Sequence, residues 1–143
     1  MLLSQWALAG FVTWTMLLVV CTIGYARVSA VLRGEARANA FNAAVPHGSE
    51  RYQRCMRAHM NGVENLPLFA SLVLLGSVLG VAGATFQLAA AAVLPARVGQ
   101  SLVHIASGRS RAVVVRFYFF SLQIVCFAVM LVALVLQALA KRG

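Results

Sequence analysis

Three long stretches of this sequence carry no charged side chain, and they constrain the fold more than any other feature. They cover residues 1–26, 65–96 and 117–140. A helix needs roughly 20 predominantly apolar residues to cross the ~30 Å hydrocarbon core of a bilayer. The middle stretch is too long for one such helix, and Gly80, Gly83 and Ala84 indicate a turn inside it. The sequence therefore predicts four membrane-spanning helices.

The predicted fold is an all-α, integral membrane four-helix bundle that forms a single domain over residues 1–143. The composition agrees with this class, because 62% of the residues are apolar and only 10% are charged. No basic segment precedes the first span and no A-x-A site follows at a suitable distance, so we expect this span to be retained rather than cleaved. Arg27 is expected to end it. The expected spans cover about residues 4–26, 62–82, 85–107 and 112–139.

The arginines are distributed unevenly along the chain. One group lies between the first two spans, at Arg27, Arg33, Arg37, Arg51, Arg54 and Arg57. A second group surrounds the link between the last two spans, at Arg97, Arg109, Arg111 and Arg116. The turn between the second and third spans carries no charge. By the positive-inside rule, both arginine-rich links of this multi-pass protein are predicted to lie on the cytoplasmic side.

The net charge of +9 does not indicate a nucleic-acid-binding protein. No lysine-rich tail and no interleaved aromatic and basic motif accompany it. Topology and membrane lipids with anionic head groups explain much of this charge, and a bound anion is the more specific alternative. The three cysteines, Cys21, Cys55 and Cys126, are widely separated and form no C-x-x-C pair. We therefore expect neither a disulfide framework nor a metal site.

A polar face is predicted on the second long helix. Ser49 is a suitable N-cap, so this helix should begin near residue 50, outside the membrane. Four polar residues then follow the i, i+3, i+7, i+10 spacing that places side chains on one helix face: Arg54, Arg57, Asn61 and Glu64. Ionisable residues in membrane helices usually mark a functional site.

A second polar face is predicted on the third span, where Arg97, Gln100 and His104 follow the i, i+3, i+7 spacing. If both faces line one pocket, the arginines suit a carboxylate or a phosphate. Glu64 could receive an ammonium group or orient an arginine. The sequence leaves simpler roles open. Arg57 and Glu64 could pair internally, Arg54 could reach lipid phosphates, and His59 could be only a hydrogen-bonding residue near the interface.

The second long helix resembles the MAPEG family, the membrane-associated proteins in eicosanoid and glutathione metabolism. The resemblance rests on the run from Arg54 to Phe69 and on its pattern R-x-x-R-A-H-x-N-x-x-E-N. It implies a homotrimer of four-helix bundles with glutathione as co-substrate, bound between subunits near the cytoplasmic face. The glutathione contacts that it implies are Arg27, Arg54, Arg57, His59, Asn61, Glu64, Arg97, Gln100 and His104.

The resemblance also implies the chemistry. Family members place an arginine early in the last helix near the glutathione sulfur, where it favours the reactive thiolate. The candidates for this catalytic role are Arg116, the favoured one, then Arg111 and Tyr118. Three positions depart from residues found in some relatives: Gln100 from histidine, His104 from tyrosine and Phe117 from serine. These departures argue against isomerase chemistry on prostaglandins. The expected activity is a microsomal-type glutathione transferase or peroxidase acting on an apolar electrophile or a lipid hydroperoxide. The alternative is a non-catalytic protein that binds an anionic lipid or another small thiol.

Overall fold

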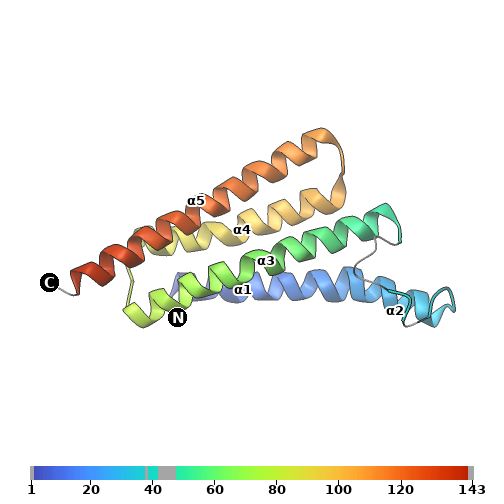
Figure 1. Cartoon of the computed structure of the whole chain (residues 1–143), viewed down its shortest axis with the longest axis horizontal. Helices are drawn as coiled ribbons and strands as arrows, with labels where there is room; N and C mark the ends of the chain where they lie inside the picture. Colours follow the sequence, from blue (N-terminus) through green and yellow to red (C-terminus); the bar gives the residue numbers. More distant parts are fainter. Residues whose placement is uncertain (1, 38, 42–47, 142–143) are drawn as a thin grey trace.

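The computed structural model describes residues 2–37, 39–41 and 48–141, and every regular element within them is a helix. Four of the helical rods are long and apolar enough to cross a membrane, as the sequence predicts. They lie side by side as an elongated bundle (Figure 1). The elements are α1 (Leu3–Leu18), η1 (Val19–Gly24), α2 (Tyr25–Leu32), α3 (Glu50–Leu79), α4 (Ala84–Ala106) and α5 (Ser110–Ala140).

The first rod is longer than the predicted span, because the helix does not end at Arg27. α1, η1 and α2 follow one another without a break to Leu32, with the π-helical turn of η1 in the middle. Arginine is a good helix former, so a charge alone does not end a helix. The Arg27 guanidinium reaches sideways instead, and its Nε donates to the Tyr52 hydroxyl of α3 over 2.7 Å.

α3 begins and ends as the local sequence predicts. The Ser49 side chain accepts a hydrogen bond from the backbone N–H of Tyr52 at 3.2 Å, so Ser49 is the N-cap. Glu50 lies in the first turn, where a carboxylate complements the helix dipole. Gly80 ends the helix in the left-handed region at φ 67°, which glycine adopts without a steric penalty. The predicted turn therefore separates α3 from α4.

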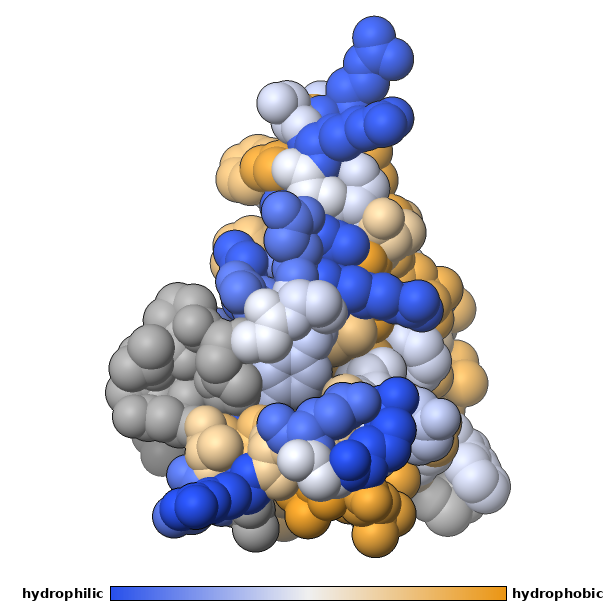
Figure 2. Space-filling view, turned by 90° about the vertical axis from the view of Figure 1, so that its right-hand side faces the viewer, coloured by the Kyte–Doolittle hydropathy of each residue, from blue (hydrophilic) through white to orange (hydrophobic). Residues whose placement is uncertain are grey.

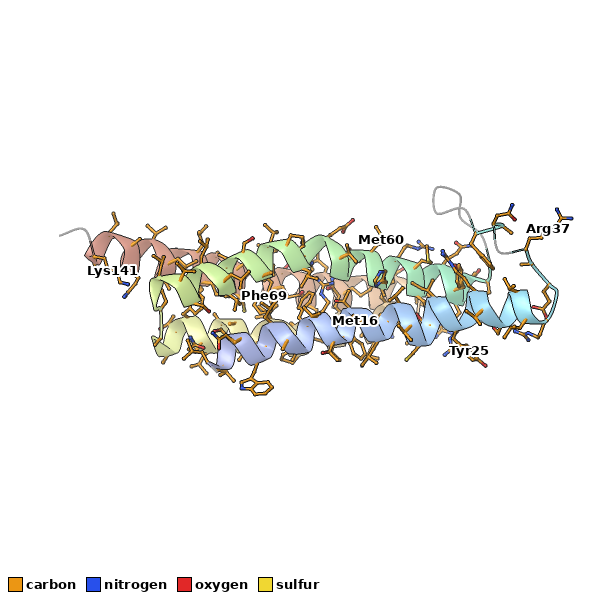
Figure 3. All side chains as sticks on the ribbon, turned by 90° about the horizontal axis from the view of Figure 1, so that it is seen from below. Met16, Tyr25, Arg37, Met60, Phe69 and Lys141 are labelled. Carbon is orange, nitrogen blue, oxygen red and sulfur yellow. The ribbon has the colours of Figure 1, made fainter. Side chains whose placement is uncertain are left out.

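Both arginine-rich links lie at the same end of the bundle. Figure 1 shows α2, the start of α3 and the α4–α5 turn together at one end. The chain termini and the α3–α4 turn lie at the opposite end. Figure 2 looks onto the first of these ends, where hydrophilic side chains gather. Arg37 and Lys141 lie at opposite ends of the molecule in Figure 3. We call the end with α2 and the α4–α5 turn the arginine-rich end.

The apolar core lies between the four long helices. Phe69 of α3 is fully buried, and its ring centroid lies 5.5 Å from that of Phe11 and 6.0 Å from that of Phe127. Figure 3 shows Phe69 inside the bundle. Phe86, Val93 and Met130 complete a cluster to which α1, α3, α4 and α5 all contribute. Close packing here fixes the relative positions of the helices that carry the polar residues.

Candidate functional site

The polar stripe of α3 is turned away from the apolar core. Arg57 and Glu64 are exposed and Asn61 is partly exposed, whereas the residue that follows each of them is buried. In a membrane-spanning helix, such side chains are costly unless they face protein or a water-filled cavity. The stripe is thus accessible in the single chain and is available to a ligand or to a neighbouring subunit.

Arg54 connects α3 to the end of α4. Its Nε donates to the backbone oxygen of Ile105 at 3.1 Å, and its Nη1 lies 3.4 Å from Glu50 Oε2. Ile105 belongs to the last turn of α4, where carbonyl groups lack a partner within the helix. A cation there also complements the helix dipole. Arg54 therefore holds α4 in place beside the stripe.

Arg57 and Glu64 do not pair with each other, so the simpler internal ion pair is wrong. Within the described part of the chain, the ion pairs are Arg33–Glu35 and Arg54–Glu50. Arg57 donates only through Nε, to the backbone oxygen of Gln53 at 3.4 Å. Its terminal nitrogens and the Glu64 carboxylate therefore remain available for binding.

Arg97 of α4 is the most unusual side chain in the molecule. It is 0% exposed, and its Nε, Nη1 and Nη2 have no hydrogen-bond partner among the described residues. Its guanidinium carbon lies 5.4 Å from the centroid of the Phe11 ring, a cation–π contact. Glu64 is the acid whose charge acts on it. Buried charges are normally paired and hydrogen-bonded, so this site holds unused donor capacity.

Gln100 is committed to contacts between α4 and α5. Its Nε2 donates to the backbone oxygen of Arg116 at 3.4 Å, and its Oε1 accepts from Gln123 Nε2 at 3.1 Å. Gln123 is fully buried and also donates to the backbone oxygen of Phe119 at 2.9 Å. The two glutamines thereby fix the first turns of α5, which carry Arg116, against α4.

The two histidines occupy different surroundings. His104 is buried on α4, and the charges of Arg54, Arg57 and Arg116 all act on it. That the polar faces of α3 and α4 line one pocket stays a prediction. His59 is partly buried, and its Nδ1 has no partner among the described residues. Its polar atom is therefore unsatisfied within the chain.

The remaining candidates lie nearer the periphery. Arg27 lies 5.3 Å from the Phe41 ring centroid in addition to its bond to Tyr52, and it packs beside α3 of its own chain. Arg116 is partly buried and Arg111 is exposed. Tyr118 is 69% exposed. Of the three predicted catalytic residues, Arg116 is the one whose charge acts on a residue of the α4 stripe.

Sequence reasoning missed two residues of this region. Phe11 lies below Arg97, but nothing distinguishes it from the other apolar residues of the first span. Gln123 could have been noticed in the sequence, because it is a polar residue in an apolar stretch of its helix, three residues before Cys126. A buried amide in such a helix normally finds a partner on a neighbour, and here that partner is Gln100.

The sequence model of the MAPEG family matches residues 5–136, which is nearly the whole chain. The chain belongs to the MAPEG family. No individual curated protein matches it by sequence. Family membership and the four long apolar helices together make it an integral membrane protein. MAPEG proteins include glutathione transferases and peroxidases as well as non-catalytic members. Family membership therefore does not decide the activity of this chain.

Proposed function

We propose that this MAPEG protein is a membrane-bound glutathione transferase or peroxidase that binds glutathione along the polar faces of α3 and α4. The observation that carries the proposal is that charged groups on these two faces lack partners among the described residues. The three side-chain nitrogens of Arg97 have no hydrogen-bond partner there, and Arg57 and Glu64 form no ion pair with each other. Two cations and one anion complement a ligand with two carboxylates and one ammonium, which is the charge pattern of glutathione.

The individual roles follow from geometry and charge. Arg57 and Arg97 offer planar donor groups suited to the carboxylates of the tripeptide, and Glu64 offers an acceptor for its ammonium. Asn61, which lies between Arg57 and Glu64 on α3, supplies amide hydrogen bonds. Arg54 supports the site through its bond to Ile105. His59, His104 and Gln100 border the same region, and Gln100 acts on the site by positioning α5.

The proposed assembly is a homotrimer in which neighbouring copies cover the exposed stripe. Arg57 and Glu64 are exposed on a helix that is long and apolar enough to cross a membrane. Neither side chain is stable against hydrocarbon, so this face requires protein or water beside it. A neighbouring subunit would supply protein there, and the proposed role of Arg27 is to complete the pocket of such a neighbour. The proposed location of the site is the cytoplasmic side, since the arginine-rich end is there by the positive-inside rule.

Arg116 is the proposed catalytic residue. A cation beside the glutathione sulfur stabilises the thiolate relative to the thiol, which raises the concentration of the nucleophile at neutral pH. In the transferase reaction the thiolate attacks an apolar electrophile and the leaving group departs. In the peroxidase reaction two glutathione thiols are oxidised to glutathione disulfide, and the lipid hydroperoxide is reduced to the alcohol and water. Arg111 and Tyr118 are the secondary candidates.

The proposal is tested with purified protein in detergent micelles. Wild-type protein is expected to bind glutathione in calorimetry and to conjugate it to an aryl halide. Arg116→Ala should retain binding and lose most of the turnover, because its charge acts on the sulfur rather than on the carboxylates. Arg109→Ala, which removes the same charge from the exposed N-cap of the same helix, is the matched control and should retain activity. Absence of glutathione binding at millimolar concentration would overturn the proposal.

One observation favours a second function. Phe117 and Tyr118 are 64% and 69% exposed, so the first turns of α5 direct apolar and aromatic groups outward beside Arg116. This arrangement suits a non-catalytic protein that holds an anionic lipid or another small thiol in the same pocket. Lipid that copurifies and is displaced by glutathione, together with unchanged behaviour of Arg116→Ala, would favour it. A turnover that depends on Arg116 would exclude it.

A further inference from the structure

Two of the three cysteines face one groove at the arginine-rich end, away from the polar stripe described above. The groove has a volume of about 360 Å³ and is lined by residues from η1, α2, α3 and the end of α4. Cys21 of η1 and Cys55 of α3 both line it, together with Arg51. Cys21 is exposed, and Cys55 is 6% exposed. The groove thus gives a small molecule access to both sulfurs.

The packing of helix one on α3 places these two cysteines at the same level of the bundle. Gly62 of α3 lies against Thr15 of α1, with 3.3 Å between the position of an added Cβ and Thr15 Oγ1. Further along, Arg27 of α2 bonds to Tyr52 of α3. The two helices run in opposite directions (Figure 1). Residues that follow Thr15 on helix one are therefore level with residues that precede Gly62 on α3. Cys21 therefore lies level with Cys55.

The two cysteines of the groove differ in exposure. Cys21 is exposed, whereas Cys55 is 6% exposed. An accessible cysteine that an oxidant can reach, with a second cysteine nearby to resolve its sulfenic acid, is the arrangement of a redox-active pair. Cys126, by contrast, is buried on α5 within the apolar core cluster. It provides an internal control for non-specific oxidation.

We propose that Cys21 and Cys55 form a redox-active thiol pair that an organic hydroperoxide oxidises to a disulfide. The Cys21 thiolate attacks the terminal oxygen of the hydroperoxide, the O–O bond breaks, and the alkoxide leaves as the alcohol after taking a proton. Cys21 is then a sulfenic acid. The Cys55 sulfur attacks the Cys21 sulfur, the S–O bond breaks, and water leaves. Two electrons pass from the thiol pair to the hydroperoxide, and two small-molecule thiols return them by exchange.

This pair is independent of the proposed glutathione site, so its test needs no glutathione. The purified full-length protein in detergent micelles is treated with cumene hydroperoxide and digested without reduction, and its peptides are analysed by mass spectrometry. We expect the peptides that contain Cys21 and Cys55 to be linked within one chain, with Cys126 still a free thiol. Treatment with dithiothreitol should release them. Arg57→Ala, designed to weaken glutathione binding, should form the same link.

Variants separate the two steps. In Cys55→Ala, the sulfenic acid of Cys21 has no partner and should accumulate, where dimedone traps it. In Cys21→Ser, Cys55 should stay reduced, because the attacking sulfur is missing. Cys126→Ala should form the link as the wild type does. The proposal is overturned if hydroperoxide oxidises the cysteines separately, links different chains, or attacks Cys126 before any link between Cys21 and Cys55 appears.

Discussion

The apolar core around Phe69 and the polar region around Arg97 lie next to each other in the bundle, and they are built on opposite principles. Phe69 packs against Phe11 and Phe127, so every surface of its ring is in contact with a neighbour. Arg97 is equally buried, but its side-chain nitrogens have no hydrogen-bond partner in the described part of the chain. Phe11 touches both residues. The region around Phe69 stabilises the fold. The buried charge of Arg97 lowers the stability of the ligand-free protein and leaves hydrogen-bond donors for a ligand.

The largest expected effect is in the apolar core. Phe69→Ala should lower the free energy of unfolding by on the order of 3–5 kcal/mol, because it leaves a cavity between helices that cannot fully close. Thermal unfolding in detergent micelles measures this loss. Leu74→Ala, on the same helix but 59% exposed, is the matched control and should change stability little. Equal losses in the two variants would show that the region around Phe69 is not the main packing core.

Arg97→Leu should act in the opposite direction on stability. Removing a buried charge that lacks partners is expected to stabilise the ligand-free protein by ~1–4 kcal/mol while abolishing glutathione binding. Unfolding curves and binding calorimetry on the same preparation measure both effects. Arg97→Lys keeps the charge but removes the planar donor group, so it should weaken binding without stabilising the protein. Loss of stability in Arg97→Leu would mean that Arg97 is a structural residue, and the contrast with Phe69 would fail.

Gln123→Leu tests the connection between the two regions. The change leaves Gln100 Oε1 without its donor inside the bundle, so stability should fall by ~1–3 kcal/mol. Because Gln100 and Gln123 hold the first turns of α5, turnover with an aryl halide should fall more than glutathione affinity does. The double variant Gln100→Leu/Gln123→Leu removes both partners and should recover part of the stability. Strictly additive losses in the double variant would argue against a coupled pair.

Arg54→Ala has the smallest expected effect. It removes the bond to the Ile105 oxygen at the end of α4, which should cost ~0.5–1.5 kcal/mol. Glu50→Gln removes only the exposed ion pair with Arg54 and should change stability by no more than ~1 kcal/mol. Chemical denaturation at low and high salt distinguishes the two, since only the ion pair is screened. A larger loss in Glu50→Gln would assign the stabilisation to the ion pair instead.

The sequence predicted the helices well because their causes are local. Hydropathy and length set the four spans, Ser49 set the start of α3, and Gly80 set its end. The sequence was wrong about Arg27. A charged residue after an apolar stretch looks like the end of a helix, but here the helix continues and the Arg27 side chain bonds to Tyr52 of α3. It also could not show that Arg97 is buried whereas Arg57 is exposed, since both belong to similar polar stripes. Which stripe faces inward depends on how the helices pack.

Binding calorimetry of glutathione to the wild type and to Arg57→Ala tests the central proposal most directly. Arg51→Ala removes the same charge from another exposed position of α3 and serves as the matched control. We expect Arg57→Ala to weaken binding by about tenfold or more, equivalent to ~1.4 kcal/mol, and Arg51→Ala to bind as the wild type does. Equal affinity in all three proteins, or no binding in any, would contradict a glutathione site on the polar faces of α3 and α4.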